Sequence, residues 1–211
     1  LRGTLHASIL GSTIANGKIV RFDATKALEL EGVERIITYK DITGENQIGG
    51  IIEDEPLFAD HEVHFHGQPI AIAVATSEFI ARKAVSLIEV EYEEHTPVVN
   101  PREAQQKGLL LIPPRTFKMG NVDETWNKCK YIFEGSVEMG GQEHLYIETQ
   151  GSYAYFIENG YIKVHSSTQG PTAVQKTISR VLGIPMHLIE VDVVRLGGGF
   201  GGKEDQASGF A

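Results

Sequence analysis

Strict alternation of apolar and polar residues marks one clear strand, at residues 88–93. Ile88, Val90 and Tyr92 share one side of this segment, and the glutamates between them share the other. Because successive side chains of a strand point to opposite faces, the pattern predicts a sheet with one buried and one solvated face. We therefore expect the glutamates to face solvent and to take no part in chemistry.

Two predicted helices in the same half of the chain follow residues that can cap them. Asp23 precedes a helix at residues 24–30, and Gly32 suits the end of that helix because glycine tolerates the left-handed conformation. Ser77 can cap a second helix, whose apolar face is Ala81, Ala84, Val85 and Ile88. The predicted strands around these helices are residues 6–10, 17–22, 35–39 and 70–76.

Prolines interrupt the periodic pattern between Val98 and Phe117. We place a linker at residues 109–116, between a first domain at residues 1–108 and a second at residues 117–211. The elements predicted in the second domain are a helix at 121–130, strands at 131–139, 151–158, 161–166 and 187–196, and a helix that begins at Gly170-Pro171 and has the apolar stripe Val174, Ile178, Val181 and Leu182. Asn159-Gly160 predicts a hairpin turn, and Gly183 predicts the end of the second-domain helix. The fold class is therefore α+β.

Composition places the chain among ordinary globular proteins, with 41% hydrophobic and 22% charged residues in 211. The formal net charge is −9, and the sequence has no cluster of lysines or arginines. Both features argue against nucleic acid and anionic membranes as partners. The apolar runs are too short to span a membrane and the N-terminus lacks a signal-peptide pattern, so we expect a cytoplasmic protein. The single cysteine, Cys129, excludes a four-cysteine iron–sulfur cluster within the chain.

Three histidines, His61, His64 and His66, form the one cluster in the first half that suggests a metal. Structural zinc needs four ligands, and no cysteine or further histidine stands at a suitable spacing nearby. We interpret the three as surface or capping residues.

The main candidate site is the glycine-rich stretch at residues 197–204, Gly-Gly-Gly-Phe-Gly-Gly-Lys-Glu. Glycines leave the backbone free to adopt positive φ angles and to approach a ligand closely. Gly197–Gly202 also satisfies the dinucleotide pattern G-x-G-x-x-G, but that pattern is weak without an acidic residue about 20 positions later. The P-loop pattern fails, because Glu204 stands where a serine or threonine is required and its carboxylate would repel phosphates. A mobile turn is the bland interpretation.

A second polar motif lies upstream, at residues 141–148, Gly-Gln-Glu-His-Leu-Tyr-Ile-Glu. Together with Gly198–Glu204 it closely resembles the molybdenum-cofactor part of the xanthine dehydrogenase and aldehyde oxidase family of molybdenum hydroxylases. Both motifs stand in that family's order and at about its spacing, and the resemblance covers essentially the whole chain. It implies an α/β hammerhead domain followed by the first, truncated part of a molybdopterin-binding domain.

The resemblance also implies roles for single residues. Gln142 matches a glutamine near an oxo ligand of the molybdenum, and Gly199, Phe200 and Gly201 match residues that flank the cofactor. Neither Gln142 nor Phe200 is a direct metal ligand. Glu204 matches a substrate-binding carboxylate. The family's catalytic glutamate and most of its pterin-binding surface lie in later segments, so we expect this chain alone to be inactive.

The activity implied by the resemblance is hydroxylation of a heterocycle or an aldehyde, with oxygen from water, at a Mo-molybdopterin cofactor. Electrons would leave through 2Fe-2S clusters and FAD on other domains or subunits of an oligomeric enzyme. Glu204 favours a purine, hypoxanthine or xanthine, because a carboxylate can engage ring nitrogens that aldehydes lack. Three alternatives stay open: an aldehyde oxidase-type hydroxylase, a nucleotide-binding module that uses Gly197–Gly202, and a non-catalytic packing module of a larger assembly.

Overall fold

The computed structural model describes residues 3–211, so the first two residues of the predicted hammerhead domain lie outside the described part. The chain divides into two compact units. One comprises Leu1–Pro97 with His144–Ala211, and the other comprises Val98–Glu143. Helices and strands are mixed along the chain, which confirms the α+β prediction. Its short 3-10 helices are η1 (Tyr39–Asp41), η2 (Glu158–Gly160), η3 (Met186–Leu188) and η4 (Gln206–Phe210).

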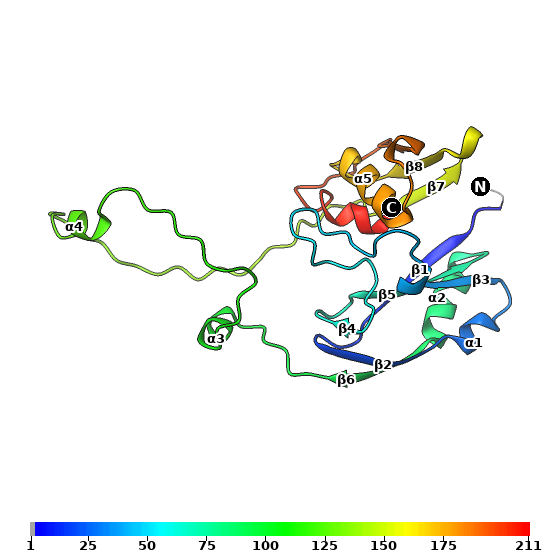
Figure 1. The fold of residues 1–211 in the computed structure, drawn as a ribbon, viewed down its shortest axis with the longest axis horizontal. Helices are drawn as coiled ribbons and strands as arrows, with labels where there is room; N and C mark the ends of the chain where they lie inside the picture. Colours follow the sequence, from blue (N-terminus) through cyan, green and yellow to red (C-terminus); the bar gives the residue numbers. More distant parts are fainter. Residues whose placement is uncertain (1–2) are drawn as a thin grey trace. The chain divides into compact units, whose positions relative to one another are not determined.

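The first sheet of the larger unit is antiparallel and has the strand order β1-β5-β3. Its strands are β1 (His6–Gly11), β5 (Pro69–Ala75) and β3 (Val33–Thr38). Helices α1 (Thr25–Leu28) and α2 (Glu78–Leu87) pack beside it (Figure 1). The Ser77 hydroxyl accepts a hydrogen bond from the Ile80 N–H at 3.2 Å, which confirms the predicted cap. Of the predicted helix face, Ala84 and Ile88 lie in a buried core cluster with Ala27 and Ala73. Val85 packs against this cluster, and Ala81 is buried as well.

The second sheet has the order β4-β2-β6, with β4 (Glu62–Val63), β2 (Gly17–Asp23) and β6 (Glu89–Glu94) antiparallel. The alternation predicted for β6 is confirmed, because Val90 and Tyr92 are half-buried and the glutamates are exposed. The glutamates still have partners: Glu91 pairs with Arg21 at 2.7 Å, and Glu89 pairs with Lys26. These surface pairs contribute little to stability.

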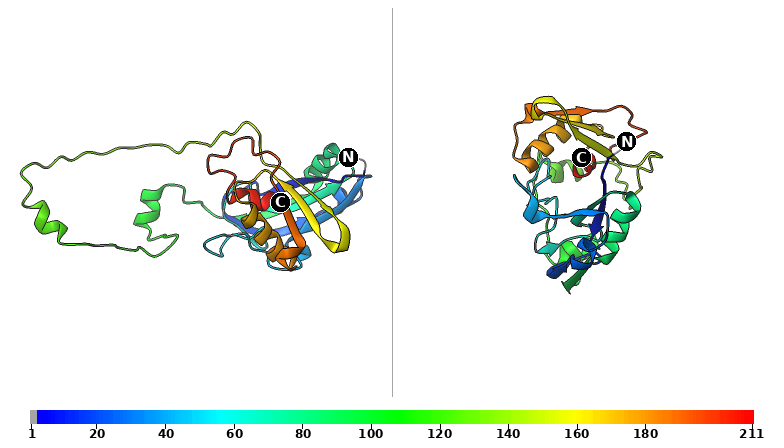
Figure 2. Two further views of the ribbon diagram at one scale, coloured as in Figure 1. Left: turned by 90° about the horizontal axis from the view of Figure 1, so that it is seen from above. Right: turned by 90° about the vertical axis from the view of Figure 1, so that its right-hand side faces the viewer.

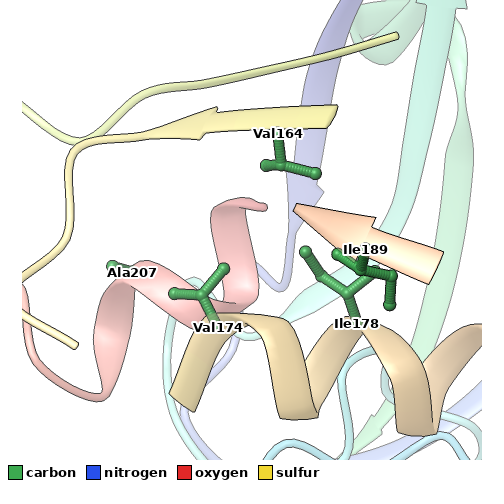
Figure 3. Close-up of a cluster of buried hydrophobic side chains, with 5 residues drawn as sticks. All are labelled: Val164, Val174, Ile178, Ile189 and Ala207. Atoms are coloured by element: carbon green, nitrogen blue, oxygen red, sulfur yellow. The ribbon is translucent and has the colours of Figure 1, made fainter. Parts of the chain in front are cut away.

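The third sheet, β7-β8-β9, carries the candidate site at its end. Strand β7 (Ser152–Phe156) is antiparallel to β8 (Ile162–Ser166), and β9 (Ile189–Asp192) is parallel to β8. Helix α5 (Pro171–Leu182) makes the crossover that a parallel pair requires. Figure 3 shows its residues Val174 and Ile178 pointing toward side chains of β8, β9 and η4. The buried cluster consists of Val164, Val174, Ile178, Ile189 and Ala207.

The turns of this region follow the predictions closely. Asn159 and Gly160 have φ angles of 60° and 77°, as a primed hairpin turn requires. Gly183 ends α5 with a φ of 67°, and Pro171 occupies the first turn of the helix. The strand predicted at residues 187–196 is shorter, because β8 pairs with only four residues of it, Ile189–Asp192. Leu182 is 40% exposed in the last turn, so the predicted apolar stripe stops before it.

The first predicted helix is also shorter than expected. The Asp23 carboxylate accepts a hydrogen bond from the Thr25 N–H at 3.0 Å, so the first helical residue is Thr25. The Leu30 N–H bonds to the Ala27 carbonyl, three residues earlier, and the chain then leaves the helix. Gly32, with a φ of 90°, supplies the reversal into β3.

The carbonyls at the end of α5 bond to a loop that lies more than 130 residues earlier in the chain. The Gly44 N–H donates to Val181 O at 2.9 Å, and the Thr43 hydroxyl donates to Leu182 O at 2.7 Å. Such carbonyls have no partner inside their own helix. A Cβ at Gly44 would lie 2.1 Å from Arg180 O, so only glycine fits there.

Val98–Glu143 forms two short helices joined by extended chain (Figure 2). Helix α3 (Pro101–Gln106) forms where the sequence had lost its periodicity, because the Asn100 side chain caps it. Helix α4 (Val122–Trp126), capped by Asn121, is shorter than predicted. The strand predicted at residues 131–139 is wrong. That segment is extended, but within this described unit no second strand exists to bond it.

No helix in residues 3–211 has both the length and the apolar character needed to cross a membrane.

Candidate functional site

The glycine loop follows β9 and turns through several left-handed residues. The φ angles are 68° at Gly197, 92° at Gly198, 54° at Phe200 and 94° at Gly201. Glycine adopts such angles without steric cost, whereas a bulky residue such as Phe200 is strained in them. Strain of this kind persists where the surrounding structure enforces it, and it is concentrated at functional sites.

The second polar motif packs directly against this loop. A Cβ at Gly197 would lie 2.3 Å from the Glu148 carboxylate, and a Cβ at Gly202 would lie 2.7 Å from the Tyr146 ring and 2.8 Å from the His144 ring. The structure therefore brings together the later half of the upstream motif and the glycine loop. It also gives a steric reason for glycine at both positions.

Two glutamines that the sequence analysis missed hold the loop. The Gln169 side-chain oxygen accepts hydrogen bonds from the N–H groups of Gly201 at 3.0 Å and Lys203 at 3.3 Å. The Gln150 side-chain nitrogen donates to Gly202 O at 3.0 Å. Neither glutamine lies in a local pattern that marks function, since their partners are more than 30 residues away. Only the fold reveals them.

Lys203 is turned away from solvent, and its side chain is fully buried. Its ammonium group donates to Glu148 O and Leu196 O, both at 2.6 Å, and to Ser167 Oγ at 2.8 Å. In a P-loop the corresponding lysine reaches the bound phosphates. The orientation of Lys203 removes that cation from the loop surface, which further weakens the P-loop interpretation.

Two side chains of the loop are presented to solvent. Phe200 is 77% exposed, and its ring lies beside Gly198. Glu204 is exposed as well, and within residues 3–211 its carboxylate makes no hydrogen bond or ion pair. The loop therefore presents one aromatic ring and one carboxylate to solvent. Gln142 lies in the other unit, exposed on an extended segment.

The backbone of the loop also fits an anionic cofactor. The N–H groups of Gly198, Gly199 and Phe200 have no acceptor among residues 3–211, and successive unpaired amides bind anions. The Gln150 side-chain oxygen beside the loop is buried and has no partner in the described chain. The loop thus offers hydrogen-bond donors to a cofactor.

No three His, Cys, Asp or Glu side chains gather closely enough in residues 3–211 to hold a metal, and His61, His64 and His66 form no such group.

Comparison with known proteins gives two family matches. Residues 103–211 match the molybdopterin cofactor-binding domain, and residues 1–96 match the a/b hammerhead domain of aldehyde oxidase and xanthine dehydrogenase. The first match alone covers more than half of the chain.

Similar proteins share nearly the whole chain. A xanthine dehydrogenase of Drosophila pseudoobscura pseudoobscura is 39% identical over 99% of this chain, which spans 16% of that relative's length. An aldehyde oxidase 2 of Cavia porcellus is 37% identical over 97% of the chain and 15% of its own length. The solved structure of an aldehyde oxidoreductase from Desulfovibrio gigas has a TM-score of 0.81 and 26% identity over 92% of this chain and 23% of its own.

The loop geometry and the comparisons agree with the resemblance carried by the two motifs. The nucleotide-binding alternative finds no support among the relatives. The chain belongs to the molybdopterin cofactor-binding domain family, here preceded by an aldehyde oxidase and xanthine dehydrogenase a/b hammerhead domain.

Proposed function

We propose that the chain is part of a molybdenum-dependent hydroxylase that oxidises purines such as hypoxanthine or xanthine. When bound, the molybdopterin cofactor supplies the redox centre that takes electrons from the substrate and delivers oxygen from water. The proposal includes further molybdopterin-binding domains, and 2Fe-2S and FAD domains or subunits, in a cytoplasmic, oligomeric enzyme. Residues 109–116 remain our proposed linker between the two domains.

One observation carries the substrate assignment. Glu204 is exposed beside a loop in which three successive N–H groups, those of residues 198–200, have no acceptor, and its carboxylate has no partner within the described chain. A carboxylate exposed to solvent gains nothing from the protein, but it can accept a hydrogen bond from a purine N–H. Charge-assisted hydrogen bonds of this kind orient a substrate, and orientation contributes strongly to rate.

The other residues of the loop have supporting roles in this proposal. Gly199 lets the loop pack closely on Gln169, because a Cβ there would lie 2.4 Å from Gln169 Oε1. The free N–H groups of Gly199 and Phe200 would donate to oxygens of the cofactor, and Phe200 would cover one side of it. Gly201 shapes the turn, since its own N–H already donates to Gln169. Gln142 would donate to an oxo ligand.

The test is substrate preference in the full-length enzyme. Glu204→Val should lower kcat/KM for xanthine by roughly 10- to 100-fold, as loss of a charge-assisted hydrogen bond predicts. The value for an aldehyde, which has no ring N–H, should change by less than about threefold. Glu34→Val is the matched control, because Glu34 is exposed on β3 and valine suits a strand.

Two results would contradict the proposal. An equal fall for both substrate classes would assign Glu204 a structural role. A wild-type enzyme that oxidises aldehydes and leaves xanthine unchanged would favour the aldehyde oxidase-type alternative. The 37% identity to an aldehyde oxidase supports that alternative.

A further inference from the structure

The most unusual buried group in the described chain is the ammonium of Lys203. The side chain is 0% exposed, and among residues 3–211 it forms no ion pair with a carboxylate. Removing an ammonium from water is costly unless its donors are satisfied by well-placed acceptors. The position therefore needs a physical reason.

The hydrogen bonds of this group are complete. Nζ has acceptors at Glu148 O, Leu196 O and Ser167 Oγ, which matches the three N–H bonds of an ammonium. The Ser167 hydroxyl donates its own proton to Leu196 O at 2.9 Å, so its lone pairs are free to accept from the lysine. The Tyr146 ring lies 4.6 Å from Nζ and adds a cation–π contact.

These contacts close the glycine loop at its base. Leu196 immediately precedes the first glycine and Lys203 immediately follows the last, so the bond from Nζ to Leu196 O joins the two ends of Gly197–Gly202. Without such a tie, six residues of which five are glycine would lose much conformational entropy on ordering. The tie makes the loop geometry available before any ligand binds.

The backbone of the same residue is fixed on both sides. Its N–H donates to Gln169 Oε1, and its carbonyl accepts from the Gln169 N–H at 2.7 Å and from the Thr168 hydroxyl at 3.2 Å. Glu204 follows this fixed backbone directly, and within the described chain its exposed side chain has no hydrogen bond or ion pair of its own. The backbone position of Glu204 is therefore set by Lys203.

We propose that Lys203 is a positioning residue, which closes the glycine loop through Leu196 and Glu148 and thereby fixes the backbone from which Glu204 projects for substrate recognition. This inference rests on the proposed role of Glu204. A lysine saturated by three acceptors and sealed from solvent does not itself contact substrate.

A double-mutant cycle in the full-length enzyme separates positioning from a general structural role. Lys203→Met keeps the length of the side chain and removes its charge. It should lower kcat/KM for xanthine by roughly 10- to 100-fold, the size usual for loss of a supporting contact. The same change in a Glu204→Val background should have an effect of less than about threefold, because the substrate contact that Lys203 supports is then already absent. Fold-changes that simply multiply would overturn the proposal.

Hydrogen exchange gives a readout that does not depend on activity. The two hydrogen-bonded amides of the loop, Gly201 and Gly202, should exchange at least tenfold faster in Lys203→Met than in the wild type. Ser167→Ala, which removes one acceptor and disturbs the fold less, should show a smaller change in the same direction. Lys176→Met is the control, since Lys176 is exposed on α5. Unchanged exchange in both variants would refute loop closure.

The failures of the two proposals can be told apart. If Glu204→Val alone leaves both substrate classes unaffected, the substrate role of Glu204 is wrong, and the claim that Lys203 acts through it falls as well. If Glu204→Val is impaired for xanthine and the cycle is additive, only the Lys203 proposal fails.

Discussion

Gly44→Ala should uncouple the loop at residues 43–45 from the end of α5. The added Cβ would lie 2.1 Å from Arg180 O and 2.9 Å from Val181 O, and both are backbone atoms that cannot swing aside. Separation breaks the bonds from Gly44 N–H to Val181 O, from Glu45 N–H to Arg180 O, and from the Thr43 hydroxyl to Leu182 O. At about 1 kcal/mol each these hydrogen bonds amount to about 3 kcal/mol.

The net effect is smaller than that sum. Replacing glycine by alanine restricts the unfolded chain and returns about 0.4–1 kcal/mol. The ion pairs of Arg180 with Glu45 and Glu53 are exposed on the glutamate side and add little. We expect Gly44→Ala to lower the free energy of unfolding by about 2 kcal/mol.

Urea unfolding of the 211-residue chain, followed by circular dichroism and extrapolated linearly to water, measures this difference. Gly50→Ala is the matched control: Gly50 lies in the same long segment between β3 and β4, has no positive φ, and a Cβ there meets nothing within 4 Å. Its free energy of unfolding should stay within about 1 kcal/mol of the wild type. Equal values for the two variants would show that the contact at the helix end contributes nothing.

Two further changes test other parts of the chain. In the full-length enzyme, Gln142→Ala should raise the activation free energy that sets kcat by about 2–3 kcal/mol, with little effect on KM. An unaltered Mo(V) spectrum with normal turnover would refute the proposed role of Gln142 near the metal. In η1, hydrogen bonds from the Thr38 backbone N–H and from Arg35 lower the pKa of Asp41. The stability this gives is present above the unfolded pKa of 3.8 and is lost as pH falls through the lower folded pKa. Asp41→Asn should therefore destabilise by about 0.5 kcal/mol at pH 7 and approach the wild type below the folded pKa; a difference independent of pH would contradict this.

Local patterns predicted what depends on neighbouring residues. The β6 alternation, the Ser77 cap, the Asn159-Gly160 turn and the end of α5 at Gly183 all follow from the conformational preferences of a few adjacent residues. The strand predicted at residues 131–139 failed because a strand requires a hydrogen-bonded partner, which a single segment cannot show.

The site divides in the same way. The glycine loop and Glu204 stood out in the sequence, since five glycines in six positions are rare and have a direct physical meaning. Gln150, Gln169 and the inward direction of Lys203 did not, because their partners are distant in sequence and because a lysine next to glycines normally suggests a phosphate. The roles of Gln142 and Glu204 remain proposals.

The closure of the loop by Lys203 has a consequence for the order of assembly during folding. A hairpin such as β7–β8 forms within about 1–10 μs from local contacts. The ammonium of Lys203, by contrast, has no favourable buried position until Glu148, Ser167 and Leu196 have all arrived. Desolvating it earlier would raise the barrier, so the loop closes after the third sheet is complete, as a late step that mainly slows unfolding. We expect the glycine loop to be the last part of this region to order and the first to open.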